Sequence, residues 1–251
     1  MSRQTLVERF RSARSDPALA VLEGFHPLKH AIRFGAELIE VIGMNIDELE
    51  ELRADYAPDI AGGMDKIVRV VSAEVFQELA PIPPPTGVIA VARRPTVSPT
   101  DVLNNPVPAP VILLENLRNL LNIGAAIRVA AAAGAAGVVT TGTQDPWHPA
   151  ALIAGAGLQY ALPVTRIDTL PISDRSLVVV DPGGEPLRQG SVPAHAILAF
   201  GSERGGLSPE LMASADQCIS IPMLPGVSSL NLASAVAVVL YAWRLEQDPS
   251  R

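Results

Sequence analysis

Apolar residues in the first third of the chain follow two periodicities. Three segments have the β-rich, apolar character of strands, and three repeat apolar residues at helical spacing. The strands are expected at residues 36–42, 67–71 and 87–92, and the helices at residues 28–34, 46–56 and 73–79. Alternating elements of both kinds predict a small α/β domain.

Farther along the chain, the expected strands are apolar throughout. They lack the polar alternation of a strand with one face in water, so they predict parallel strands covered on both faces. These strands fall at residues 111–114, 137–140, 177–180 and 196–200, and helices are expected at residues 123–133, 209–213 and 231–245. Ser208 is placed to cap the helix that begins at Pro209. This part of the chain predicts an α/β domain with a mostly parallel sheet.

Proline marks the boundary between the two parts. Nine prolines fall between Pro81 and Pro110, which is too many for a helix and unfavourable within a central strand. The sequence therefore predicts a first domain over residues 1–95, a proline-rich linker over residues 96–109 and a second domain over residues 110–251.

The composition is that of a globular protein. The chain has 251 residues, of which 48% are hydrophobic and 18% charged. No apolar run approaches the roughly 20 residues that cross a bilayer, and the charged N-terminus is unlike a secretory signal. The expected location is therefore the cytoplasm. With one cysteine, Cys218, and four histidines, we expect neither an intrachain disulfide nor a metal site.

The net charge of −7 is opposite to that of a domain that attracts nucleic acid by its overall charge. Any contact with RNA must therefore be local, and neither DNA nor a membrane is an expected partner. The N-terminal segment contains Arg3, Arg9, Arg11 and Arg14. These arginines form either a phosphate-facing patch or the solvated face of a helix.

Three polar clusters follow expected strands of the second domain. In the first, Asn122 would lie at the carboxyl edge of the sheet, where α/β proteins bind ligands. Arg128 follows it in an apolar, alanine-rich helix, where a guanidinium is costly without a partner. A structural ion pair and a functional role for Arg128 fit the sequence equally.

The second cluster is rich in glycine. Gly201, Gly205 and Gly206 surround Glu203, and glycine allows the backbone to approach a ligand closely. A glycine-rich turn capped by Ser208 would give the same pattern. The spacing matches neither a dinucleotide-binding fingerprint nor a phosphate-binding P-loop.

The third cluster covers residues 219–231 and passes directly into the last expected helix. It contains Ser228, Ser229 and Asn231, which either cap that helix or face a binding site.

Taken together and in this order, the clusters are specific. They read N-x-G-x-x-x-R at residues 122–128, G-S-E-x-G-G-L-S at residues 201–208 and I-P-M-x-x-G-x-x-S-L-N at residues 221–231. The set resembles the three motifs of the SpoU, or TrmH-type, RNA ribose methyltransferases of the SPOUT superfamily. Residues 23–35 are similar to the small ribosomal-protein-like RNA-binding domain that many members carry at the N-terminus.

The resemblance implies a fold, an assembly and a cofactor. The fold would be α/β with a deep trefoil knot in the C-terminal domain, a rare exception to unknotted topology, and the protein would be a homodimer. S-adenosylmethionine would bind in the knot. By position, Gly201, Ile221 and Leu230 would line its pocket, with Met223 close by.

The resemblance also implies transfer of a methyl group to the 2′-hydroxyl of an RNA ribose. Asn122 and Arg128 match the catalytic positions of the family, and Glu203, Ser229 and Asn231 match the remaining polar positions. Because a guanidinium is a poor base, we expect Arg128 to bind the adjacent phosphate and stabilise the developing alkoxide.

Ribosomal RNA is the expected substrate, because domains related to the first one recognise kinked RNA by shape. A transfer RNA substrate, a non-catalytic RNA-binding or assembly factor and an enzyme with a small-molecule substrate stay open. The chain departs from the family in three places. It has Asn119 and Leu120 where an Asp-Pro or Asn-Pro pair is common, and Ile153 and Gly155 where a basic residue and then serine are frequent.

Overall fold

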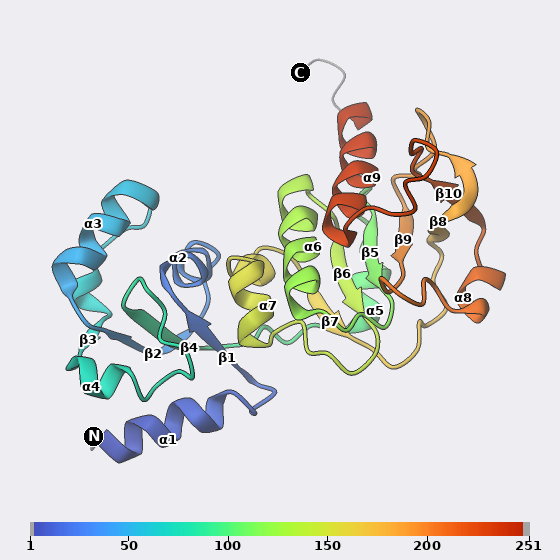
Figure 1. Cartoon of the computed structure of the whole chain (residues 1–251). Coiled ribbons are helices and arrows are strands. Elements are labelled where there is room, and N and C mark those ends of the chain that lie inside the picture. The colour runs from blue at the N-terminus through green and yellow to red at the C-terminus, as the bar shows by residue number, and fades with distance from the viewer. Residues whose placement is uncertain (1–2, 248–251) are drawn as a thin grey trace. The chain divides into compact units, whose positions relative to one another are not determined.

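A computed structural model describes residues 3–247, and the chain divides into two compact units (Figure 1). Unit 1 comprises residues 1–96 and 147–161, and unit 2 comprises residues 97–146 and 162–251. The sequence analysis placed residues 147–161 in the second domain. This part of the expected division is wrong, because these residues pack with the first domain as part of unit 1.

Unit 1 is built on a four-stranded sheet in the order β1-β4-β2-β3. β4 pairs antiparallel with β1 and with β2, whereas β2 and β3 are parallel. The strands are β1 (Leu19–Glu23), β2 (Leu38–Gly43), β3 (Arg69–Val70) and β4 (Val88–Arg93), and the helices of residues 1–96 are α1 (Arg3–Ala13), α2 (Phe25–Arg33), α3 (Ile46–Tyr56), η1 (Met64–Lys66) and α4 (Ala73–Phe76). The expected alternation of helices and strands is confirmed, and β1 is a strand that the sequence analysis missed.

Helix α1 packs its apolar side on the sheet, where Leu6 and Phe10 join a buried cluster with Val21 and Ile89. Apolar contact across such a cluster is the main source of stability for a domain of this size.

Most arginines of α1 and of the turn that follows it are engaged by carboxylates. Arg9 Nη1 lies 2.8 Å from Glu40 Oε2, and Arg14 Nη1 lies 2.5 Å from Glu23 Oε1. Arg3 pairs with Glu78. Within residues 3–247, Arg11 has no ion pair. The structure therefore favours a charge-balanced helix surface over a phosphate-facing patch at this end of the chain.

Residues 147–161 form α7 (Pro149–Ala154) and η2 (Leu158–Tyr160). His30 Nδ1 lies 2.6 Å from the carbonyl oxygen of Ala156, and the Tyr160 hydroxyl donates to the carbonyl of Arg93 over 3.1 Å. Gly157 has a φ of +75°, and a Cβ there would lie 2.5 Å from the carbonyl oxygen of Pro27. Only glycine fits both conditions, so this segment is shaped to pack in unit 1.

Unit 2 contains a six-stranded sheet in the order β10-β8-β9-β5-β6-β7, with every pairing parallel. The strands are β5 (Val111–Leu114), β6 (Gly137–Thr140), β7 (Val164–Arg166), β8 (Ser176–Pro186), β9 (Ala196–Phe200) and β10 (Gln217–Ser220), and the helices are α5 (Pro99–Leu103), α6 (Leu120–Ala133), α8 (Pro209–Ala213) and α9 (Leu232–Gln247). The predicted α/β class and parallel sheet are confirmed. The knot stays a prediction, because strand order does not describe how a chain threads its loops.

The expected linker contains a helix, α5, against the prediction that its prolines exclude one. Pro99 occupies the first turn, where proline has no hydrogen bond to lose, and Ser98 caps the helix. Val102 and Leu103 are buried, so this part of the linker belongs to the core of unit 2.

Strand register places the candidate motifs. Leu114 at the end of β5 lies opposite Phe200 at the end of β9, and Phe200 lies opposite Val180 in β8. The loops that follow β5 and β9 therefore leave the sheet side by side. From β5 the chain continues to β6, and from β9 it continues towards β10, so β5 and β9 flank the switch point at which parallel sheets bind ligands. Helices α6 and α9 pack together over this sheet (Figure 1).

Candidate active site

A cavity of about 420 Å³, here called cavity A, opens at the carboxyl end of β9 and beside the middle of β8. Its wall combines residues 180–182 of β8, the loop after β9, and the segment that leads into α9. The lining residues are Val180, Asp181, Pro182, Phe200, Gly201, Ser202, Glu203, Arg204, Gly205, Gly206, Leu207, Ile221, Met223, Ser228, Ser229, Leu230, Leu232 and Ala235. All four expected cofactor positions lie in this wall.

The loop after β9 closes on itself by backbone contacts. Ser202 and Gly206 exchange two backbone hydrogen bonds of 3.0 and 2.9 Å. A Cβ on Gly201 would lie 2.1 Å from the carbonyl carbon of Gly206, which is far inside contact distance. Glycine at position 201 is therefore required by the loop itself, and the loop presents backbone atoms to cavity A.

Glu115 anchors the same loop to the end of β5. Its carboxylate accepts hydrogen bonds from the Ser208 amide over 2.7 Å and from the Ser208 hydroxyl over 2.6 Å. The Ser208 hydroxyl in turn accepts from the amide of Leu211, as expected of the cap of α8. The sequence predicted the cap but not the carboxylate that holds it.

A second cavity of about 720 Å³, here called cavity B, lies between the loops that follow β5 and β9. It is lined by Asn116, Arg118, Asn119, Asn122, Ser202, Glu203, Arg204 and Gly205. The last four of these also line cavity A. The segment Ser202–Gly205 is thus a wall common to both cavities. The rest of the lining is mainly apolar residues and glycine in cavity A and polar side chains in cavity B.

Side chains from the three motifs meet at this wall. The Asn122 amide donates to Glu203, and the Asn231 amide donates to Asn122 Oδ1 over 3.2 Å. Asn231 Oδ1 accepts from the amide of Ala233 over 2.9 Å and so caps α9. Asn231 therefore both caps α9 and belongs to the polar network. The sequence offered capping and a place at a binding site as alternatives, and Asn231 combines the cap with a hydrogen bond to Asn122.

Arg128 lies apart from this network. It is exposed on α6 and lines neither cavity. Among residues 3–247 no ion pair of Arg128 is found, so the structural ion pair that the sequence allowed is not formed with the described part of the chain. An exposed position relieves the desolvation cost of the guanidinium.

The departures from the family pattern have local explanations. In the pair Asn119-Leu120 it is Leu120, the first residue of α6, that replaces the common proline, whereas Asn119 accepts from the Leu121 amide over 2.9 Å and caps α6. Ile153 is exposed on α7, and a Cβ on Gly155 would crowd the side chain of Gln159. Positions 153 and 155 thus lie in the segment that packs with unit 1.

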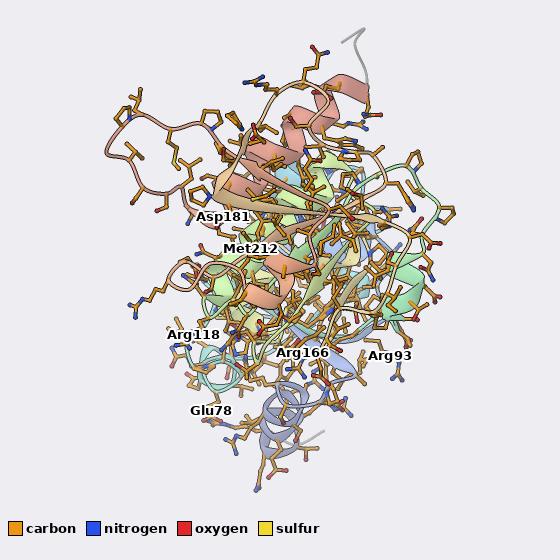
Figure 2. The ribbon with its side chains drawn as sticks, turned by 90° about the vertical axis from the view of Figure 1, so that its right-hand side faces the viewer. Glu78, Arg93, Arg118, Arg166, Asp181 and Met212 are labelled. Carbon is orange, nitrogen blue, oxygen red and sulfur yellow. The ribbon has the colours of Figure 1, made fainter. Side chains whose placement is uncertain are left out.

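Some lining residues were missed from the sequence. Asp181, labelled in Figure 2, lines cavity A. The strand expected at residues 177–180 extends to Pro186 as β8, so Asp181 lies within the strand, next to Val180, which pairs with the last residue of β9. Arg118 lies just before the first motif, and Arg204 occupies the unspecified position of the second motif.

Metal ligands, membrane-spanning helices and the cysteine were the remaining features to locate in the described residues. Residues 3–247 contain no group of three or more histidine, cysteine or acidic residues arranged to hold a metal. No helix in that range is long and apolar enough to cross a bilayer. Burial and the charge of Asp181 raise the pKa of the Cys218 thiol, which favours the protonated form and agrees with a packing role.

Residues 109–241 match the model of the SpoU rRNA methylase family. The chain is 27% identical to a 23S rRNA (adenosine(1067)-2'-O)-methyltransferase of Streptomyces laurentii, over 95% of this chain and 90% of the relative. It is 32% identical to a Synechocystis protein named as an uncharacterized tRNA/rRNA methyltransferase, over 71% of this chain and 67% of the relative.

A solved structure shows the same fold. The SpoU methyltransferase AviRb of Streptomyces viridochromogenes, solved in complex with AdoMet, superposes with a TM-score of 0.76 at 21% identity, over 100% of this chain and 99% of that chain. The family match covers more than half of the chain and includes the loops that build both cavities. The chain belongs to the SpoU rRNA methylase family.

Proposed function

We propose that this protein transfers a methyl group from S-adenosylmethionine to the ribose 2′-hydroxyl of ribosomal RNA. The observation that carries the proposal is the convergence of the three motifs on the wall between cavities A and B through Asn122, Glu203 and Asn231. In a methyl transfer, donor and acceptor must be held in line and in contact, and cavities A and B share lining residues, so ligands of the two cavities would lie next to each other.

The cofactor fits cavity A. The cavity volume of about 420 Å³ falls in the range of about 300–1,000 Å³ typical of small-molecule sites. Gly201, Ile221, Met223 and Leu230 would hold the cofactor, and its sulfonium would supply the methyl group. The carboxylates of Asp181 and Glu203 line the same cavity and would favour a cationic ligand.

The residues around cavity B would act on the RNA. Asn122 and Glu203 are hydrogen-bonded to each other, so their orientation is fixed before substrate arrives. Ser229 lines cavity A, and Asn231 fixes Asn122 from the side of α9. Arg128 would bind a phosphate next to the reacting ribose and stabilise the developing alkoxide. Its lack of an ion pair within residues 3–247 leaves the guanidinium open to such a contact.

The names of the relatives support ribosomal RNA. One is a 23S rRNA (adenosine(1067)-2'-O)-methyltransferase and another a 23S rRNA (guanosine-2'-O-)-methyltransferase RlmB of Bordetella pertussis, 27% identical over 88% of this chain. Unit 1 would contribute to RNA recognition, and the cytoplasm is where such a substrate is met. The transfer RNA alternative rests on relatives named tRNA/rRNA methyltransferases.

A homodimer is part of the proposal. Val238, Tyr241 and Leu245 repeat at helical spacing along α9 and are all exposed, and Leu121 of the neighbouring helix α6 is 55% exposed. Exposed apolar side chains on packed helices are typical of an oligomer interface. Sedimentation of the native chain and of Tyr241→Glu tests this assignment: a dimer that dissociates in the variant supports it, and a native monomer refutes it.

Calorimetric titration with S-adenosylmethionine tests the cofactor site. Leu230→Arg places a long charged side chain in the wall of cavity A, so micromolar binding by the native chain should be lost in this variant. Leu224→Arg is the matched control, because Leu224 is in the same segment, 78% exposed, and outside the cavity wall. Absence of binding by the native chain, with and without RNA, would favour the non-catalytic assembly factor.

Transfer of tritiated methyl groups to an unmodified 23S rRNA transcript tests the reaction. Arg128→Ala should lose most of the turnover, because Arg128 matches the catalytic position of the family. It should keep its S-adenosylmethionine affinity, because Arg128 does not line cavity A. Full turnover in this variant would remove the role proposed for Arg128.

A further inference from the structure

Cavity B carries two cations that none of the motifs explains. Arg118 comes from the loop after β5, and Arg204 comes from the loop after β9. Both are exposed, and they line the same cavity as Asn122 and Glu203. The side chain of Arg118 extends away from the sheet (Figure 2).

These two arginines differ from most in unit 1. There, Arg9, Arg33 and Arg69 each pair with a carboxylate at 2.6–2.9 Å. Within residues 3–247, the side chains of Arg118 and Arg204 have neither an ion pair nor a hydrogen bond. Ion pairs thus engage most arginines of unit 1, whereas the described residues form none with Arg118 or Arg204.

The carboxylates near cavity B are already engaged. Glu203 accepts from Asn122, and Glu115 accepts two hydrogen bonds from Ser208. Cavity B therefore presents two guanidinium groups against one lining carboxylate, in a chain whose net charge is −7. A local positive site in an acidic protein fits an anionic ligand that bulk charge would repel.

We propose that Arg118 and Arg204 bind phosphodiesters of the RNA strand that enters cavity B, beyond the phosphate next to the reacting ribose that is assigned to Arg128. The inference rests on the proposed function. Guanidinium groups bind phosphate oxygens in a bidentate manner, and phosphate contacts fix the register of a strand without reading its bases. The two arginines would hold the backbone while Asn122 and Glu203 face the ribose.

The test measures binding of the full chain to an unmodified 23S rRNA transcript between 50 and 200 mM potassium chloride. Arg118→Ala and Arg204→Ala should each weaken binding about tenfold, and each should reduce the slope of log Kd against log salt by roughly 0.7–0.9. Arg188→Ala is the matched control, because Arg188 is also exposed in unit 2 and lines neither cavity. Thermal unfolding of all three variants should match the native chain.

Steady-state methylation separates binding from chemistry. We expect a higher KM for RNA with little change of kcat, and unchanged affinity for S-adenosylmethionine. If Arg204→Ala loses cofactor affinity and keeps its salt slope, Arg204 serves cavity A and its phosphate role is overturned. If both variants keep native Kd and slope while the native chain methylates RNA, the inference fails and the proposed function stands. If the native chain binds the transcript without methylating it, and the variants lose slope, the two phosphate contacts stand, whereas the proposed function and the assignment of cavity B to a methylated strand fail.

Discussion

Gly201→Ala is the substitution for which the structure makes the sharpest prediction. The added Cβ would lie 2.1 Å from the Gly206 carbonyl carbon, 2.3 Å from its oxygen and 2.4 Å from the Leu207 nitrogen. Real Cβ contacts almost never fall below 3.0 Å, and all three neighbours are backbone atoms, so no side chain can move aside. The loop must open by about 1 Å, and the two hydrogen bonds between Ser202 and Gly206 would be strained or lost.

The magnitude follows from those two hydrogen bonds. Each contributes about 0.5–1.5 kcal/mol, so the closed loop should be destabilised by about 1–3 kcal/mol. Since 1.4 kcal/mol is about a factor of ten, affinity for S-adenosylmethionine should fall by about 5-fold to 150-fold. Methylation should fall at least as far, because a misplacement of about 1 Å at a reacting centre can cost about a hundredfold in rate.

Gly205→Ala is the matched control in the same loop. A Cβ there would lie 3.1 Å from the Ser202 hydroxyl oxygen, which is the end of a rotatable side chain. Calorimetric titration should give an affinity within about threefold of the native value for this variant. If Gly201→Ala also binds the cofactor with native affinity, the closed loop is not part of the cofactor site.

Three further variants test contacts inside one unit each: two in unit 2 and one in unit 1. Arg175 is 3% exposed and donates to the carbonyls of Leu103, Asn105 and Ala109. Arg175→Met would leave these acceptors unpaired, so urea titration should show a free energy of unfolding lower by about 3–5 kcal/mol. An unchanged urea midpoint would contradict this role. Glu115→Gln should weaken its two hydrogen bonds to Ser208 and reduce kcat without unfolding the chain, since it holds the loop shared by both cavities; native kcat would refute that coupling. Hydrogen bonds from the Arg53 side chain and the Met64 amide lower the pKa of Glu50 below its usual value, so Glu50 stabilises the fold above about pH 4.5 and this contribution is lost as pH falls through the lowered pKa. Glu50→Gln should therefore be less stable than the native chain at pH 7 and equal to it in strong acid, and a constant difference at all pH values would contradict the assignment.

Local pattern was sufficient for much of the fold. The apolar runs at residues 111–114, 137–140 and 196–200 became β5, β6 and β9 with the same bounds, because an uninterrupted apolar run is stable as a strand only where both faces are covered. The helix expected at residues 46–56 also kept its bounds, since Asn45 supplies its cap. Where short strands lacked a clear period, as at β1 and β7, the sequence did not reveal them.

For the candidate site, the sequence identified residues, whereas the contacts between them came from the structure. The resemblance of the three motifs to the SpoU family singled out Asn122, Glu203 and Asn231, and the cofactor positions that it implies all lie in the wall of cavity A. The hydrogen bonds that join the three polar residues, between positions about 80 to 110 apart, needed the register of β5 and β9.

The sequence by itself determined the periodic elements, the α/β class and the family, because each depends on residue types at short, fixed spacing. Tertiary structure alone decided that residues 147–161 pack with unit 1. It also decided which arginines are neutralised by carboxylates and which remain unpaired at cavity B. The physical reason is that periodicity reports which face of an element is buried, whereas pairing between distant segments depends on strand order and register, which no local window contains.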